Sequence, residues 1–232
     1  MNPISSNPTA SAYLKPGSWR KPKYLLFAII ALMAIYVLQH NERFIVDPKA
    51  PVWNHYQPFK WWLLAHGLAG ACALVLAPMQ FSDRLRRRYT GLHRTAGKIY
   101  MVGATLAGLT GIYIQFFQER TGGTRSFTMA STTQGTLWML TTLIAFVLIL
   151  KGKVQEHRQW MTRSLFLGPV VFLTARVILG VTGLEKLGPS MIETVVWICI
   201  TCAVPVADIV LQWEESLRSR SANFMSPVSP KV

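Results

Sequence analysis

Residues 61–81 read WWLLAHGLAGACALVLAPMQF and contain no Lys, Arg, Asp or Glu. A helix needs about 20 mostly apolar residues to cross the hydrocarbon core of a bilayer, so this stretch predicts a transmembrane helix. Further apolar runs lie at 24–39, 96–117, 129–150, 161–181 and 191–213. The run at 24–39 is the shortest and follows a polar segment, so we interpret it as a retained signal anchor.

The composition supports a protein that sits in a membrane. Hydrophobic residues make up 51% of the 232 residues and charged residues only 15%, whereas soluble domains carry about 25% charged residues. The formal net charge is nevertheless +14. These charges stand in short clusters between long apolar runs instead of covering a polar scaffold. The pattern excludes intrinsic disorder of the whole chain and argues against a nucleic-acid partner; the expected partner is the lipid bilayer.

The positive charges alternate between the segments that join the apolar runs. With six spans, 17 of the 24 Lys and Arg residues fall on the side that holds the two termini, and six fall on the opposite side. The positive-inside rule then places both termini in the cytoplasm. We therefore predict an all-α, polytopic transmembrane bundle of six spans in the cell's plasma or inner membrane.

This topology divides the chain into three parts. Residues 1–23 and 216–232 are rich in Ser, Pro, Asn and basic residues, and we expect both to be disordered cytoplasmic tails. Residues 24–215 form the six-helix domain. The segment 40–60 contains three prolines and is expected to be an irregular loop outside the cytoplasm. Pro169 and Pro205 are expected to kink the fifth and sixth spans.

Histidines and small residues share faces on the predicted helices. His66 lies about 8 Å inside the second span, counted from its outer end, and Gly70, Ala73 and Ala77 follow on the same face. Ionisable side chains at such a depth usually face a protein interior and serve a function. The small residues indicate either close helix packing or room for a flat ligand.

Two further histidines stand where outward-running helices begin. His93 precedes the third span and His157 the fifth, each with small residues above it on its own face, among them Gly97 and Gly168. A porphyrin between two helices needs an imidazole from each side and glycines where the ring edge passes. This layout suggests haem b with His93 and His157 as ligands of the iron, while interfacial charge is the alternative role for both histidines.

A single arginine, Arg176, lies within the fifth span. An arginine in hydrocarbon costs at least about 2.5–3.5 kcal/mol on insertion scales, so it requires a partner or an anionic ligand. Glu193 is the nearest carboxylate in depth. Asp208 lies deeper, where it would accept a hydrogen bond from His93 or His157 or serve as an interfacial charge.

The motifs around these residues resemble a family of predicted integral membrane proteins, DUF2306, over about residues 60–182. They are His66 with Gln80-Phe81, His93-Arg94 with Gly97 and Tyr100, the run His157-Arg158-Gln159-Trp160-Met161-Thr162-Arg163, and Arg176. The resemblance implies a membrane protein and supports this choice of residues, but it implies no reaction.

Three functions remain open from the sequence. The first is a membrane redox protein linked to haem b or quinone, in which His66 and Arg176 form an outer site and Arg176 holds a propionate or quinone oxygen. The second is a small-solute transporter or channel with His66 and Arg176 along a polar path. The third is an accessory membrane subunit without chemistry. The few scattered carboxylates and the lack of a G-x-S-x-G motif give hydrolase chemistry little support.

Overall fold

The computed structural model describes residues 22–41, 47 and 49–225, and every regular element among them is a helix. The expected tails lie partly beyond this range, since residues 1–21 and 226–232 are outside the described residues. The all-α prediction is thus confirmed for the described part of the chain.

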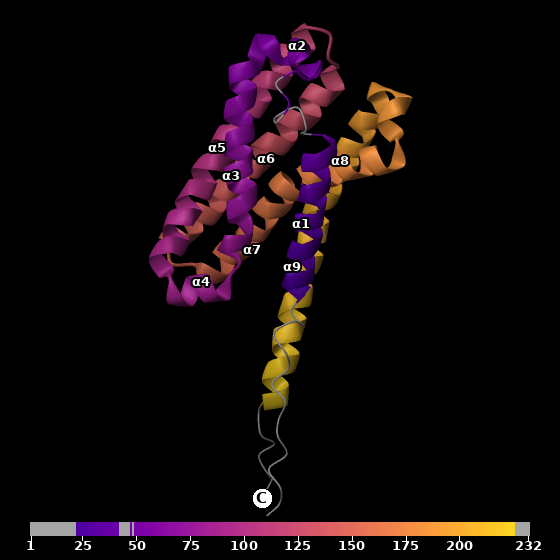
Figure 1. Cartoon of the computed structure of the whole chain (residues 1–232). Helices are drawn as coiled ribbons and strands as arrows, with labels where there is room; N and C mark the ends of the chain where they lie inside the picture. The colour runs from indigo at the N-terminus through magenta and orange to yellow at the C-terminus, as the bar shows by residue number, and fades with distance from the viewer. Residues whose placement is uncertain (1–21, 42–46, 48, 226–232) are drawn as a thin grey trace, which may run out of the picture.

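The helices run up and down between two ends of the molecule (Figure 1). The element bounds, in chain order, are α1 Pro22–His40, α2 Val52–Tyr56, η3 Gln57–Phe59, α3 Lys60–Gln80, α4 Asp83–Arg88, α5 Thr90–Arg120, α6 Arg125–Leu150, α7 Val154–Leu165, η4 Phe166–Val170, α8 Val171–Thr182, η5 Leu184–Leu187 and α9 Pro189–Met225. We name the two ends of the molecule the α2 end and the α4 end, after the short helix that lies at each (Figure 1).

Neighbouring helices in the chain pack side by side. Helix α3 packs on α5, α5 on α6, and α6 on α7, and these four form one bundle. Helices α1 and α9 both pack on α8, and α9 extends beyond the bundle at the α4 end (Figure 1).

Five of these helical segments are long and apolar enough to cross a membrane: Val52–Gln80, Thr90–Arg120, Arg125–Leu150, Val154–Thr182 and Pro189–Leu217. They contain five of the six predicted spans. Helix α1 is shorter, with an apolar part at Tyr24–His40, so the sixth crossing remains a prediction, as does the cytoplasmic location of both termini.

Along α3, α5 and α6, many large apolar side chains point out of the bundle, and the side chains that point in are mostly small. Leu68 and Leu150 are 71% and 70% exposed, whereas Ala73, Ala104 and Ala145 are completely buried. A Cβ on Gly103 of α5 would lie 3.0 Å from the Ala69 carbonyl oxygen of α3. Close approach through small residues is how helices associate in lipid. The part of α3 that carries Ala69, Ala73 and Ala77 therefore packs against α5 and leaves no room between these two helices for a flat ligand.

Two segments expected to be irregular are helical. Residues 52–59 form α2 and η3, which lead directly into α3, because Pro51 and Pro58 stand at helix starts, where a missing N–H is tolerated. Helix α9 continues through residues expected in the C-terminal tail and ends at Met225. Just before this extension, an ion pair between Glu214 and Arg158 of α7, at 3.9 Å, connects α9 to the bundle.

The two prolines expected to kink their spans behave differently. Pro169 lies in η4, a π-helical turn that separates α7 from α8, because a proline ring clashes with the carbonyl four residues earlier and removes a hydrogen bond. The chain changes direction there (Figure 1). Pro205 lies inside α9, which is assigned as one helix from Pro189 to Met225.

The topology can be tested with single cysteines at Ser126 and Ser219, in protein whose native cysteines have been replaced. Both serines are exposed, the first at the start of α6 and the second near the end of α9. We expect a membrane-impermeant maleimide applied to intact cells to label position 126 only, because the basic segments should stay in the cytoplasm. Labelling of both positions from outside would contradict six spans.

Candidate functional site

One face of α5 carries polar and small side chains along its whole length. His93, Tyr100 and Ala107 are spaced seven residues apart on this face, so they lie at depths of about 0, 10 and 21 Å along the helix axis. Three clusters of polar contacts meet α5 at these depths. One lies at the α4 end, one in the middle and one toward the α2 end.

The middle cluster is a ring of hydrogen bonds between α5, α6 and α7. The Tyr100 hydroxyl lies 2.9 Å from Ser164 Oγ, and Ser164 Oγ lies 2.7 Å from Thr142 Oγ1. The indole of Trp138 donates to the Tyr100 hydroxyl at 3.3 Å, and Thr142 donates to the Trp138 carbonyl at 2.7 Å. All four residues are buried. We call this set the hydroxyl ring.

The number of protons fixes the direction of every bond in the hydroxyl ring. Thr142 has one hydroxyl proton and donates it to the Trp138 carbonyl, so Ser164 must donate to Thr142. Ser164 has then used its own proton, so Tyr100 must donate to Ser164. Each hydroxyl donates once and accepts once. A fully satisfied buried network of this kind rigidifies the place where it forms.

Next to the hydroxyl ring, α6 packs tightly on η4. A Cβ on Gly168 would lie 2.2 Å from Cε2 of the Trp138 indole, so no residue larger than glycine fits there without a shift. One turn from Trp138 toward the α2 end, Gln134 Nε2 donates to the Leu167 carbonyl of the same π turn at 3.2 Å. The Trp138 indole and the Gln134 amide therefore both contact the π-helical turn that contains Pro169.

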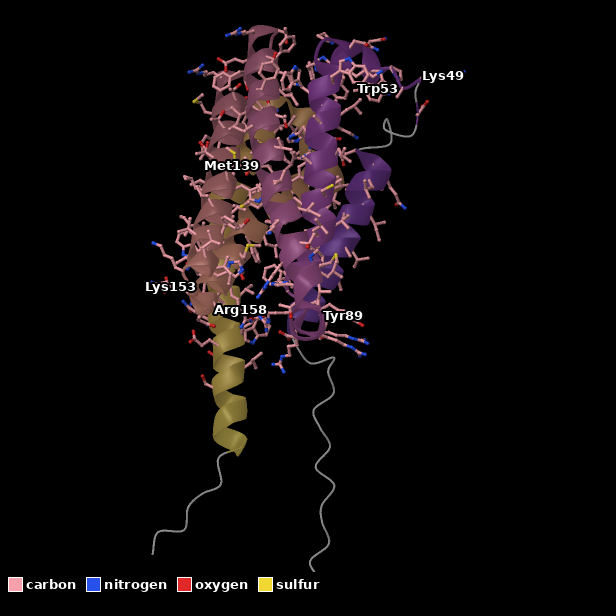
Figure 2. All side chains as sticks on the ribbon, turned by 90° about the vertical axis from the view of Figure 1, so that its left-hand side faces the viewer. Lys49, Trp53, Tyr89, Met139, Lys153 and Arg158 are labelled. Atoms are coloured by element: carbon pink, nitrogen blue, oxygen red, sulfur yellow. The ribbon has the colours of Figure 1, made fainter. Side chains whose placement is uncertain are left out.

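At the α4 end, His93 and His157 lie at the same depth. Each histidine stands seven residues before a member of the hydroxyl ring, His93 before Tyr100 and His157 before Ser164. Both helices start at the α4 end (Figure 1), and the two hydroxyls are in contact, so both histidines lie about 10 Å below the ring. They are close enough to interact electrostatically. Figure 2 shows Tyr89 and Arg158, near the starts of these helices, at this same end.

The ring nitrogens of these two histidines have different surroundings. His157 Nδ1 lies 2.7 Å from the Ala145 carbonyl oxygen and must donate to it. His93 Nδ1 is buried and has no hydrogen-bond partner among the described residues. His93 also lies within electrostatic range of Arg86 and Arg94. The pair is thus brought together as expected, but in positively charged surroundings.

The glycines that suggested a porphyrin site are covered by side chains. A Cβ on Gly97 would meet Gln80, one on Gly108 would meet Met139, and one on Gly168 would meet Trp138. A porphyrin ring that rises from His93 past Gly97 would have to displace the Gln80 side chain. The arrangement therefore does not fit haem b between the two helices. Among the described residues, no group of three or more His, Cys, Asp or Glu is placed to hold a metal ion.

Asp208 has a different partner from the one expected. Its Oδ1 accepts hydrogen bonds from Arg163 Nε at 2.9 Å and from the terminal nitrogen Nη2 at 2.8 Å. Arg163 lies six residues after His157 and faces α9, so its long side chain reaches the carboxylate across the helix interface. We therefore correct the expected contact with His93 or His157 to an ion pair with Arg163.

Toward the α2 end, His66 is held against α5. Its Nδ1 lies 2.9 Å from the Ala107 carbonyl oxygen, and its ring fills the space beside Gly111, where a Cβ would lie 3.0 Å from Cε1. Arg176 of α8 is within electrostatic range of this imidazole. The Arg176 guanidinium carbon also lies 3.8 Å from the centre of the Phe172 ring. This site thus brings together His66 and Arg176.

Glu193 lies near the same end and contacts α6. Its Oε1 accepts a hydrogen bond from the Thr124 hydroxyl, which joins the start of α6 to the start of α9. The expected pairing of Glu193 with Arg176 remains a prediction.

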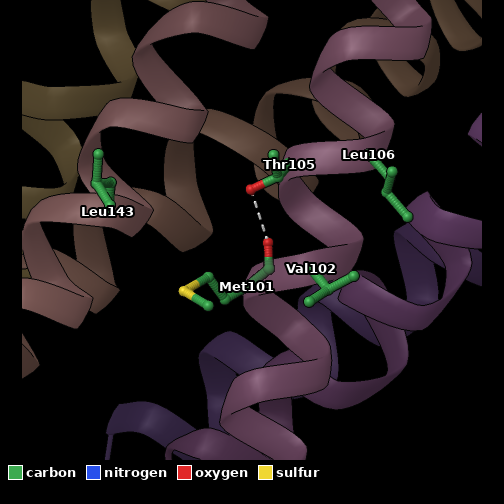
Figure 3. A pocket seen from close by; sticks show the side chains of 5 residues that line it. All are labelled: Met101, Val102, Thr105, Leu106 and Leu143. Carbon is green, nitrogen blue, oxygen red and sulfur yellow. Dashed lines mark hydrogen bonds between the residues drawn. The ribbon is translucent and has the colours of Figure 1, made fainter.

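A shallow groove of about 310 Å³ lies on the outside of the bundle, between α5 and α6 (Figure 3). Its lining is Met101, Val102, Thr105, Leu106 and Leu143. The Thr105 hydroxyl donates to the Met101 carbonyl at 3.0 Å, so the one polar side chain of the lining is satisfied within its own helix. The groove is apolar and faces away from the polar clusters, which suits contact with lipid chains.

Four residues of the middle cluster and its surroundings were not predicted from the sequence: Gln134, Trp138, Thr142 and Ser164. A signal was present, because the first three recur every four residues and so share one face of an otherwise apolar helix. Single Ser and Thr residues are common in transmembrane helices and usually bond to their own backbone. Only the packing of α6 against α5 and α7 distinguishes these residues from such cases.

The hydroxyl ring should contribute measurably to stability. Replacing Ser164 by Ala removes the acceptor of Tyr100 and the donor of Thr142 in a buried site, so we expect a loss of about 1–3 kcal/mol. Thr105→Ala serves as the control, because its hydroxyl bonds within α5 on the exposed surface, and should change stability by about 0.5 kcal/mol or less. Unfolding in detergent measures both, and equal stabilities would exclude a stabilising role for the ring.

The comparisons with known proteins agree with the helical architecture. A family model described as a predicted membrane protein, DUF2306, matches residues 63–211. The match extends well into α9, beyond the expected limit near residue 182. No curated protein and no solved structure matches the chain. Because the family model covers more than half of the sequence, the chain belongs to the DUF2306 family of predicted membrane proteins.

Proposed function

We propose that this integral membrane protein binds the polar head of a quinone-type, membrane-soluble ligand at His66 and Arg176. The observation that carries the proposal is the placement of an imidazole, oriented by the Ala107 carbonyl, beside an arginine within the apolar helices. The proposal includes six spans and cytoplasmic termini, which puts the site in the outer half of the membrane.

The orientation of His66 determines which chemical group it can bind. Its Nδ1 faces a carbonyl, which only accepts hydrogen bonds, so Nδ1 must carry the proton. In the neutral imidazole, Nε2 then has a lone pair and acts as an acceptor. A neutral His66 therefore favours a ligand with a hydroxyl group, such as the reduced, quinol form.

Arg176 supplies the complementary group. A guanidinium only donates hydrogen bonds and keeps its charge, so it favours an oxygen with partial or full negative charge. The guanidinium of Arg176 lies over the Phe172 ring. This cation–π contact stabilises an arginine in apolar surroundings. An acceptor and a donor close together match the oxygens of a quinol or quinone head group.

Open space beside α3 supports entry from the lipid. Gly70, one turn from His66 on the same face, has no atom within 4 Å of the position where a Cβ would stand, and the same holds for Gly67. Leu68, between them, is 71% exposed. A ligand dissolved in the hydrocarbon would reach this side of the helix directly.

The middle of the bundle argues for binding over solute passage. The hydroxyl ring fills the interior with residues that are at most 9% exposed, and it separates His66 from the two histidines at the α4 end. A solute moving along the bundle axis would have to break all of its hydrogen bonds. This sealed centre gives a transporter or channel less support than a site open to the lipid.

The binding site can be tested with a short-chain benzoquinol and protein in lipid nanodiscs, with quenching of tryptophan fluorescence as the readout. We expect saturable binding that weakens about tenfold or more in Arg176→Leu, as for one lost charge-assisted hydrogen bond, and about threefold to tenfold in His66→Leu, which removes a neutral acceptor. Arg87→Leu and His55→Ala remove the same residue types at exposed positions and should bind as the wild type does. Absence of saturable binding to the wild type, or equal affinity in all variants, would refute the proposal.

A further inference from the structure

Two buried polar atoms at the α4 end lack a hydrogen-bond partner among the described residues. They are Gln80 Nε2, at the end of α3, and His93 Nδ1, in the first turns of α5. Such groups are costly unless something satisfies them. An amide nitrogen donates, and an imidazole nitrogen donates when it is protonated, so one acceptor would satisfy both atoms.

Gly97 places these two side chains on one face of α5. Gln80 Oε1 lies 3.1 Å from the position that a Cβ on Gly97 would occupy. His93 precedes Gly97 by one helical turn, and residues in that relation are neighbours on a helix surface, about 5–6 Å apart. The Gln80 amide therefore lies over the turn of α5 that carries His93.

The charges around this spot are mostly positive. His93 is within electrostatic range of Arg86, Arg94 and His157. Four carboxylates described at this end have cationic partners: Asp83 with Arg86 at 2.8 Å, Glu156 with Lys153 at 2.9 Å, Asp208 with Arg163 at 2.8 Å and Glu214 with Arg158 at 3.9 Å. A further cation, including a metal ion, would be repelled here, whereas an anion would be attracted.

We propose that Gln80, His93 and Arg94 bind a phosphate monoester at the α4 end, with the guanidinium of Arg86 nearby. A phosphate offers several acceptor oxygens, so one group can accept from Gln80 Nε2 and His93 while it pairs with an arginine. The spot lies where the apolar helices end, at the depth of lipid head groups, beside the basic helix α4. A phosphatidic acid from the adjacent leaflet and free inorganic phosphate share this chemistry.

Binding is tested by titrating the detergent-purified full chain with dioctanoyl phosphatidic acid, and separately with inorganic phosphate. We expect Arg94→Gln to weaken binding about tenfold or more, as for one lost charge-assisted hydrogen bond. Arg87→Gln is the matched control, because both arginines are exposed and only Arg94 is found within range of His93. The control should bind within about twofold of the wild type, since it removes only a distant, screened charge.

Gln80→Leu separates a ligand site from a structural role. It removes the unsatisfied amide at similar volume, so without ligand the variant should melt at the same temperature as the wild type or higher. With ligand, it should lose most of the stabilisation that the wild type gains. Binding of the phosphatidic acid alone identifies a lipid site, and binding of both probes identifies a phosphate site. Binding of neither probe, or equal binding in wild type, Arg94→Gln and Gln80→Leu, overturns the proposal.

Discussion

The hydrogen bond between the Tyr100 hydroxyl and Ser164 sets the register of the helices on which every polar cluster depends. It fixes α5 against α7 at one depth, and α6 is held between them because Thr142 and Trp138 complete the same ring. Because His93 lies seven residues before Tyr100 and His157 lies seven residues before Ser164, the two histidines also lie at one depth. The same spacing along α5 places Ala107, and with it His66, an equal distance away on the other side.

Compared with a soluble protein, the bundle reverses the places of large apolar side chains and of small or polar ones. Its surface carries many large aliphatic side chains, and the buried faces of α3, α5 and α6 carry mainly alanine, glycine and hydroxyl groups. In lipid, burial of leucine gives little association between helices, so close backbone contact and interhelical hydrogen bonds are needed instead. The approach of Gly103 to Ala69 and of Gly168 to Trp138 shows how tightly these interfaces pack. This packing leaves the polar side chains in fixed orientations, which a binding site requires.

The sequence predicts depth well and orientation around the helix axis poorly. The length of each apolar run locates five of the spans, and counting residues along the chain puts His93 and His157 at one level. The partner of Asp208 was not predictable in this way, because Arg163 and His157 stand within two turns of one helix and only the packing angle of α9 selects between them. The haem hypothesis gains no support for a similar reason: glycine spacing indicates where a close neighbour passes, and Gln80, Met139 and Trp138 are those neighbours. The hydroxyl ring was missed because it joins three helices by single hydroxyls.

The fixed directions of the hydrogen bonds in the hydroxyl ring also prevent the ring from conducting protons. A proton that travels along a chain of hydroxyls must enter where a lone pair can receive it. The ring begins at the Trp138 indole N–H, which can only donate, and it ends at the carbonyl of the same residue. This chain of hydrogen bonds therefore starts and ends at Trp138, and it offers no route for a proton between the histidines on the two sides of the ring. The four described residues of the ring therefore do not by themselves connect His66 with His93 and His157.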